Sequence, residues 1–132
     1  STLKILSYLL NIQHGKMTTF GRMRHVLLFT RANAALHLLR SLNIVKQEQA
    51  VIIFGRSEPT LHDILEDILR VRRTMLSGKI LILVGAKHIY ESMYDALNQH
   101  YTVEGEGENK RYYTRLTMNG YTASFPIHHS FR

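Results

Sequence analysis

The sequence contains no cysteine and no tryptophan, and only two of its 132 residues are proline. Without cysteine, the chain can form neither a disulfide framework nor a metal site with thiolate ligands. It also lacks a run of about 18 consecutive apolar residues, the length that a membrane-spanning helix needs. These absences exclude a disulfide-stapled scaffold and an integral membrane span, and the 45% hydrophobic share allows a packed globular core.

Acidic residues are absent from residues 1–47, which carry a net charge of +7. The next segment, residues 48–108, carries −4, and residues 109–132 carry +4 without a single acid. Clustered Lys and Arg attract phosphates, so this asymmetry predicts that both ends of the chain face a polyanion such as RNA. The alternative is a basic surface that binds nothing.

The charge pattern also suggests an organisation for a single domain over residues 1–132. Residues 1–56 and 109–132 are predicted to be basic, RNA-facing parts. Residues 57–108 are predicted to be an acidic insert that contacts protein, because a negatively charged segment is repelled by phosphate.

Apolar periodicity predicts an α/β fold, with short helices packed on a small mixed sheet, an inserted helical and strand segment, and a C-terminal β-hairpin. Buried strands are predicted at 25–29, 49–55 and 79–85. Helices are predicted from the N-terminus to about Gly15, over 31–42, after the N-cap residue Thr60, and around Ile89–Leu97.

The hairpin prediction rests on Asn119-Gly120, a dipeptide typical of two-residue type I′ turns because both positions need positive φ. The turn fixes the register, which pairs Met118 with Tyr121, Leu116 with Ala123, Thr114 with Phe125, and Tyr112 with Ile127. That face is mostly apolar and is expected to cover the core. Pro126 makes the second strand an edge strand.

The middle of the chain offers an enzyme-like alternative. The stretches "IIFGRSEPT" and "ILVGAKHIY" have the form strand–loop–helix, which is typical of nucleotide-binding or hydrolytic α/β modules. The residues that would line such a crevice are Ser57, Thr60, Asp63, Gly85 and His88. However, the sequence has no GxGxxG, GxxxxGK[ST] or GxSxG motif, and simple helix caps and turns explain the same residues. The eight histidines are scattered without metal-ligand spacing, so no metal or cofactor is expected.

The stretches "LLNIQHGK", "HVLLFTRANAALHLLRSLNIV" and "YYTRLTMNGYTASFPIHHSFR" together resemble the N-terminal domain of the universal small-subunit ribosomal protein number eight. This resemblance implies a non-enzymatic, structural rRNA-binding protein of the small ribosomal subunit that takes part in translation. Its implied partners are rRNA and neighbouring ribosomal proteins, the latter through residues 57–108. Its implied location is the ribosome, mitochondrial or cytoplasmic.

The RNA-binding hypothesis places phosphate contacts at the start of the helix after residue 30, where free N–H groups and the helix dipole favour an anion. Arg31 there can form a bidentate phosphate contact, and Tyr113 can stack on an unpaired base. The full set of predicted RNA-binding residues is Lys16, Arg22, Arg24, Thr30, Arg31, Asn33, Lys110, Tyr113 and Arg115.

Overall fold

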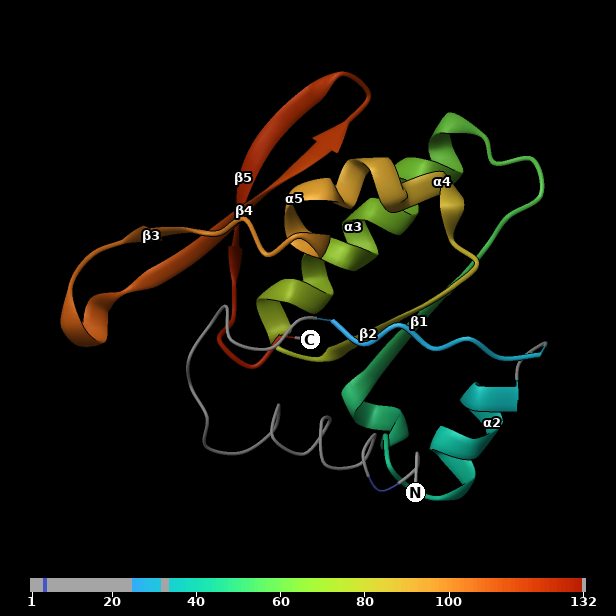
Figure 1. Cartoon of the computed structure of the whole chain (residues 1–132). Coiled ribbons are helices and arrows are strands. Elements are labelled where there is room, and N and C mark those ends of the chain that lie inside the picture. The colour runs from blue at the N-terminus through green and yellow to red at the C-terminus, as the bar shows by residue number, and fades with distance from the viewer. Residues whose placement is uncertain (1–3, 5–24, 32–33, 132) are drawn as a thin grey trace.

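The fold is α/β, as predicted (Figure 1). The computed structural model describes residues 4, 25–31 and 34–131. The elements, in chain order, are α2 (Ala34–Ser41), η1 (Gln47–Gln49), β1 (Ala50–Phe54), α3 (Leu61–Ser77), β2 (Ile80–Val84), α4 (Lys87–Tyr90), η2 (Glu91–Met93), α5 (Tyr94–Leu97), β3 (Thr102–Glu104), η3 (Gly107–Asn109), β4 (Arg111–Met118) and β5 (Tyr121–Ile127). Two small sheets replace the single mixed sheet that the sequence suggested.

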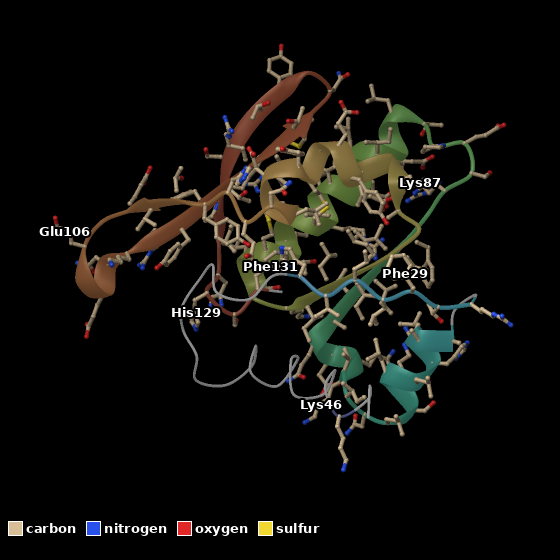
Figure 2. All side chains as sticks on the ribbon, viewed as in Figure 1. Phe29, Lys46, Lys87, Glu106, His129 and Phe131 are labelled. Atoms are coloured by element: carbon tan, nitrogen blue, oxygen red, sulfur yellow. The ribbon has the colours of Figure 1, made fainter. Side chains whose placement is uncertain are left out.

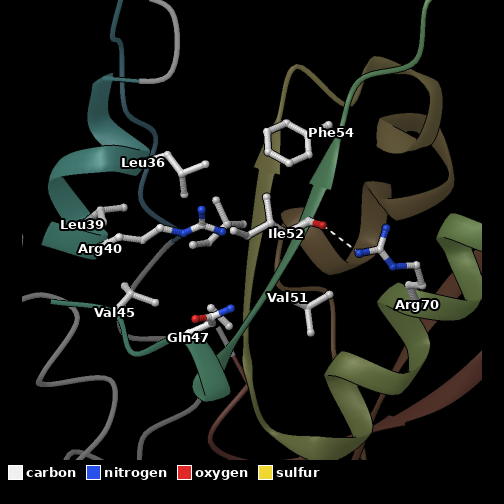
Figure 3. Close-up of a pocket in the computed structure, with 11 residues that line it drawn as sticks. Leu36, Leu39, Arg40, Val45, Gln47, Val51, Ile52, Phe54 and Arg70 are labelled. Carbon is white, nitrogen blue, oxygen red and sulfur yellow. Dashed lines mark hydrogen bonds between the residues drawn. The ribbon is translucent and has the colours of Figure 1, made fainter. Parts of the chain in front are cut away.

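The first sheet is a parallel pair in which β1 and β2 align from Ala50–Ile80 to Phe54–Val84, and α3 forms the crossover between them. Both strands are apolar throughout, as parallel strands covered on two faces are. Alternate side chains point to opposite faces. Figure 3 shows Ile52 directed toward α2 and Val51 toward α3, with the two helices on opposite sides of β1.

Each face of this sheet has its own core cluster. On the α3 side, Ile53 is fully buried with Ile68, Val71 and Met75 of α3. On the α2 side, Ile80 packs with Leu39 and Val45. Three layers therefore form around two strands, with α3 contributing the larger share of the buried surface.

Helix α3 begins after the predicted N-cap and ends at a glycine. Thr60 is the N-cap of a capping box: its hydroxyl accepts a hydrogen bond from the Asp63 backbone N–H at 3.1 Å, and the Asp63 carboxylate accepts one from the Thr60 N–H at 3.0 Å. Gly78 ends the helix with φ of 70°, in the left-handed region that favours glycine.

The helix predicted around Ile89–Leu97 is divided into α4, η2 and α5. Its predicted inward positions are nevertheless correct at Ile89, Met93 and Ala96, which are buried against the main core, whereas Leu97 is 38% exposed.

The second sheet is antiparallel, in the order β3-β4-β5. All four predicted cross-strand pairs of the β4–β5 hairpin are confirmed, from Tyr112–Ile127 to Met118–Tyr121, and Asn119 and Gly120 both have positive φ. Leu116 and Phe125 of the predicted apolar face are buried. Toward the tip the same face leaves the core, so Tyr121 is 78% exposed.

The strand predicted at 25–29 is wrong. Residues 25–30 are extended but belong to neither sheet, and Phe29 is 93% exposed (Figure 2). His25 is anchored at one end of this stretch by a side-chain hydrogen bond between its Nε2 and the Ala96 carbonyl at 3.0 Å. An apolar run forms a strand only where a neighbour offers backbone partners, and the described residues supply none here.

The predicted N-terminal helix and the basic loop after it lie outside the described residues, apart from Lys4, which is helical. Across the described part of the chain, no helix has the length and apolar character required to cross a bilayer. The division into basic parts 1–56 and 109–132 and an acidic insert 57–108 stays a prediction.

We predict that Gly78→Ala destabilises the chain more than Gly107→Ala. Both glycines have positive φ, so an alanine at either position costs about 1 kcal/mol of backbone strain. A Cβ at Gly78 would also collide with Ser130 Oγ and His128 Nδ1, whereas a Cβ at Gly107 meets open space. We expect urea unfolding to show a further loss of about 1–3 kcal/mol for Gly78→Ala. Equal losses in both variants would contradict the close packing of the α3 end on residues 128–130.

Candidate functional site

The carboxyl ends of β1 and β2 meet at one point. The Gly55 N–H donates a hydrogen bond to the Val84 carbonyl at 2.8 Å, and a Cβ at Gly55 would collide with the Gly85 carbonyl oxygen. Gly85 itself has φ of 61°. Only glycine at position 55 permits this close approach, so the loops that follow the two strands begin side by side.

Asp67 of α3 is the centre of a polar cluster at this edge. Its side chain is only 1% exposed, yet it accepts hydrogen bonds from Arg56 Nε at 2.9 Å and Arg56 Nη2 at 3.2 Å. It lies 2.7 Å from His88 Nε2 and 3.4 Å from Arg70 Nη1. The carboxylate therefore joins the loop after β1 to α4, which follows β2, and to α3, the helix between the two strands.

The environment keeps this carboxylate ionised. Burial raises the pKa of Asp67, but the hydrogen bonds from Arg56 and His88 and the positive charge of Arg56 together lower it more, to about 2. A buried carboxylate is stable only when paired in this way. The cluster is thus a neutralised internal network rather than an open acidic site.

His88 lies deepest in the cluster, with a side chain that is 4% exposed. Its Nε2 faces Asp67, while its buried Nδ1 has no hydrogen-bond partner among the described residues. A buried polar atom without a partner is unusual in native structures. The ring is therefore held by a single strong contact, to Asp67.

The outer part of the cluster involves Arg56 and the start of α3. Arg56 Nη1 also contacts Asp63 Oδ1 at 3.2 Å, and its Nη2 lies 3.9 Å from Glu66 Oε2. Arg70 donates from Nη2 to the Ile52 carbonyl at 2.8 Å, so it bridges the helix to β1. Both arginines are already engaged by the protein.

The crevice that the sequence suggested is present in part. His88 lies in the cluster and Gly85 at the strand junction, but Thr60 and Asp63 cap α3, and Ser57 is exposed in the loop. The sequence reasoning missed Arg56, Asp67 and Arg70. One signal was available: Asp67 falls among the apolar positions Ile64, Ile68 and Val71, where an acid must be buried and paired.

Behind this edge, a pocket of about 460 Å³ separates α2 from the sheet (Figure 3). Its lining is largely apolar and includes Leu36, Ile52 and Phe54. Figure 3 shows the Arg40 side chain reaching from α2 across the pocket toward Ile52, while Arg70 closes its far side.

The predicted RNA-binding residues near α2 are only partly described. Thr30 Oγ1 accepts a hydrogen bond from the Ala35 N–H at 3.2 Å and so helps to cap α2, and Arg31 is exposed. The other predicted members at this end, Lys16, Arg22, Arg24 and Asn33, lie outside the described residues.

The predicted RNA-binding residues near the hairpin are described in full. Arg115 Nε is paired with Asp95 Oδ2 at 2.7 Å, Tyr113 is half-buried opposite Pro126, and Lys110 is exposed. Figure 1 shows α2 at the lower right and the β3–β4 hairpin projecting to the left. The described members of the predicted set are therefore divided between separate places and do not form one surface.

Comparison with known proteins gives a consistent match. The family model described as "RNF213 AAA domain" matches residues 18–132. E3 ubiquitin-protein ligase RNF213 of Mus musculus is 35% identical over 112 residues, and that of Homo sapiens is 32% identical over 112 residues. E3 ubiquitin-protein ligase rnf213-beta of Danio rerio is 32% identical over 116 residues. Each match covers 83% of this chain and 2% of the relative, so the chain spans a small part of these proteins.

These matches overturn the ribosomal interpretation. The resemblance to small-subunit ribosomal protein number eight is wrong, and so are the predicted rRNA-binding function, the rRNA and ribosomal-protein partners and the ribosomal location in a mitochondrion or the cytoplasm. The prediction of a non-enzymatic protein is also wrong, because the family model is described as an AAA domain and the relatives are named as E3 ubiquitin-protein ligases. A strand–turn–helix unit and an Asn-Gly hairpin occur in many unrelated folds, so their order along the chain is not enough to identify a family.

We predict that the Asp67 cluster makes the stability of the chain sensitive to acid. The folded pKa of Asp67, about 2, lies below its ordinary value of 3.8, so its contribution is present above pH 4 and is lost as the pH falls through 2. The difference corresponds to about 2 kcal/mol. Urea unfolding at pH 6 and at pH 2.5 will show about two thirds of this loss in the unchanged chain and a smaller loss in Asp67→Asn.

Asp95→Asn is the matched control for this measurement. Asp95 also has a lowered pKa, because hydrogen bonds from His100 and Arg115 outweigh the effect of burial, but its partners are exposed. Removing its charge should cost less than about 1 kcal/mol at pH 6, against about 3 kcal/mol for Asp67→Asn. Similar losses of unfolding free energy in the two variants would show that the buried Asp67 cluster stabilises the fold no more than the ion pairs of Asp95 with exposed partners.

Proposed function

The chain belongs to the family described as the RNF213 AAA domain, and on this basis we propose that it forms the nucleotide-facing α/β layer of an AAA unit in a longer protein. The nucleotide phosphates would lie at the carboxyl edge of β1 and β2. The relatives' names suggest that the longer protein is a ubiquitin ligase.

One observation carries this proposal: the β1–α3–β2 unit brings the loops after both parallel strands together, at the contact between Gly55 and Val84. In open α/β sheets, ligands bind outside the carboxyl ends of the strands. No other part of the described chain combines a parallel sheet with two loops that meet at one edge.

One positively charged side chain near the carboxyl edge of β1 and β2, that of Lys87, is available to contact a ligand. Lys87 is the first residue of α4, three positions after the end of β2. It is exposed (Figure 2) and has no carboxylate partner among the described residues. Arg56, by contrast, is held by Asp67 and Asp63. Lys87 is therefore the side chain at this edge that is most available to contact a phosphate.

The chain supplies a wall of the proposed site rather than the whole site. A phosphate cradle of the form GxxxxGK[ST] is absent from all 132 residues. We propose that this cradle comes from another part of the longer protein. The ligase step is proposed to lie elsewhere as well, because the chain has no cysteine to carry a thioester or to bind zinc as a thiolate.

We predict that Lys87→Gln, made in the longer protein that contains this chain, weakens ATP binding about 3- to 10-fold. The reason is the loss of one charge-assisted phosphate contact, worth about 1 kcal/mol. Titration with a fluorescent ATP analogue will measure the dissociation constant, and ATP hydrolysis will be followed in parallel.

Lys79→Gln is the control, since Lys79 makes the same charge change at the opposite, amino end of β2 and is also exposed. Its affinity for the ATP analogue should stay within twofold of the unchanged protein. Identical affinities in the two variants would argue against a phosphate at the carboxyl edge.

A further inference from the structure

The pocket between α2 and the parallel sheet, which we call the α2 pocket, has the size and the walls of a small-molecule site. Its volume of about 460 Å³ lies within the range of about 300–1,000 Å³ that ligand pockets occupy. Eight of the eleven residues around it are apolar, and Leu36, Val45, Ile52 and Phe54 are among them. Such walls favour the apolar body of a ligand.

The polar side chains of the α2 pocket carry positive charge and no negative charge. They are Arg40, Gln47 and Arg70, and neither Asp nor Glu is part of the lining. Residues 25–47, which supply α2 and the chain on either side of it, also contain no acid. An anion in the pocket would therefore be attracted by its wall and would meet no carboxylate there.

The two arginines of the α2 pocket differ in how far the protein already engages them. Arg70 donates to the Ile52 carbonyl at 2.8 Å and lies 3.4 Å from Asp67. The Arg40 side chain has no hydrogen-bond or carboxylate partner among the described residues, and Figure 3 shows it extending from α2 across the pocket toward Ile52. The N–H donors of the Arg40 guanidinium are therefore available to a ligand.

We propose that the α2 pocket binds a small apolar carboxylate. The carboxylate accepts two parallel hydrogen bonds from the guanidinium of Arg40, and the Gln47 amide supplies a further donor in the lining. The apolar body of the ligand lies against Leu36, Ile52 and Phe54. This site is separate from the proposed phosphate position, because Lys87 is not part of the lining.

The composition of the wall selects a single negative charge on the ligand. Arg40 is the one cation of the lining without a partner in the described part of the chain. A ligand with two or more charges, such as a nucleotide, would leave a charge uncompensated against apolar side chains, which is costly. A neutral ligand would leave the Arg40 guanidinium unpaired.

Two compounds that share an apolar body and differ in charge, 2-naphthoate and 2-naphthalenemethanol, test the proposal. Each is added to the isotope-labelled 132-residue chain, and amide NMR spectra report both the affinity and the place of binding. We expect a dissociation constant of about 1 mM or lower for 2-naphthoate, and binding of the alcohol weaker by about fivefold or more. The amide shifts should concentrate at Leu36, Ile52 and Phe54. Equal affinities for the two compounds, or shifts confined to other parts of the chain, would overturn the proposal.

Arg40→Met and Arg31→Met separate the pocket arginine from the general positive charge of this end of the chain. Both variants remove an exposed arginine from the acid-free segment, but Arg31 does not line the pocket. Arg40→Met should weaken 2-naphthoate binding about 5- to 10-fold and leave the alcohol within about twofold, because only the carboxylate contacts the guanidinium. Arg31→Met should leave both compounds within about twofold, because solvent screens a charge outside the pocket.

The alcohol also reports whether the pocket keeps its shape in each variant, and the dispersion of the amide spectrum establishes that the variant is folded. If Arg40→Met weakens both compounds equally, Arg40 packs the pocket and binds no carboxylate, and the proposal is wrong. Unchanged binding of 2-naphthoate to Arg40→Met, or an equal loss in Arg31→Met, contradicts it as well.

Discussion

The buried carboxylate of Asp67 is the constraint on which the arrangement of this molecule depends. A charge that is 1% exposed requires compensation, and here its polar partners come from the loop after β1, from α4 and from α3 itself. Because one carboxylate must satisfy all three elements, none can move without leaving a buried charge unpaired. The carboxyl edge of the parallel pair is rigid for this reason.

The side chains that hold the carboxyl edge together are therefore different from the side chain that is available to contact a ligand. Arg56 and Arg70 would be obvious anion-binding residues if read from the sequence, but Asp67, Asp63 and the Ile52 carbonyl already engage them. Their charge is used to hold the loops, and Lys87 alone at this edge has no described carboxylate partner. An edge that internal contacts fix, and that presents one exposed lysine, fits a site shared between two segments. The other segment would then provide most of the phosphate contacts.

The sequence predicted those parts of the fold that local chemistry controls. The Asn119-Gly120 turn determined the hairpin register, and the N-cap Thr60 determined where α3 begins. Residues 25–29 have the composition of a strand but no strand partner, and the Asp67 cluster depends on side chains 11 and 21 residues away from Asp67. The charge asymmetry along the chain is real, but linear order does not determine which charges share a surface, and the rRNA-binding prediction that it supported was wrong.

Helix α3 shows how one element can serve several surfaces without conflict. Its buried arc holds Ile68 and Met75 in the core, Asp67 lies at one edge of that arc, and the exposed side chains of Leu61, Leu69 and Leu76 lie beyond its other edge. About 160° around the helix separates Asp67 from the centre of these three leucines. A substitution at Leu69 therefore leaves the contacts of Asp67 in place, whereas a substitution at Asp67 removes the carboxylate that holds Arg56 and His88 of α4.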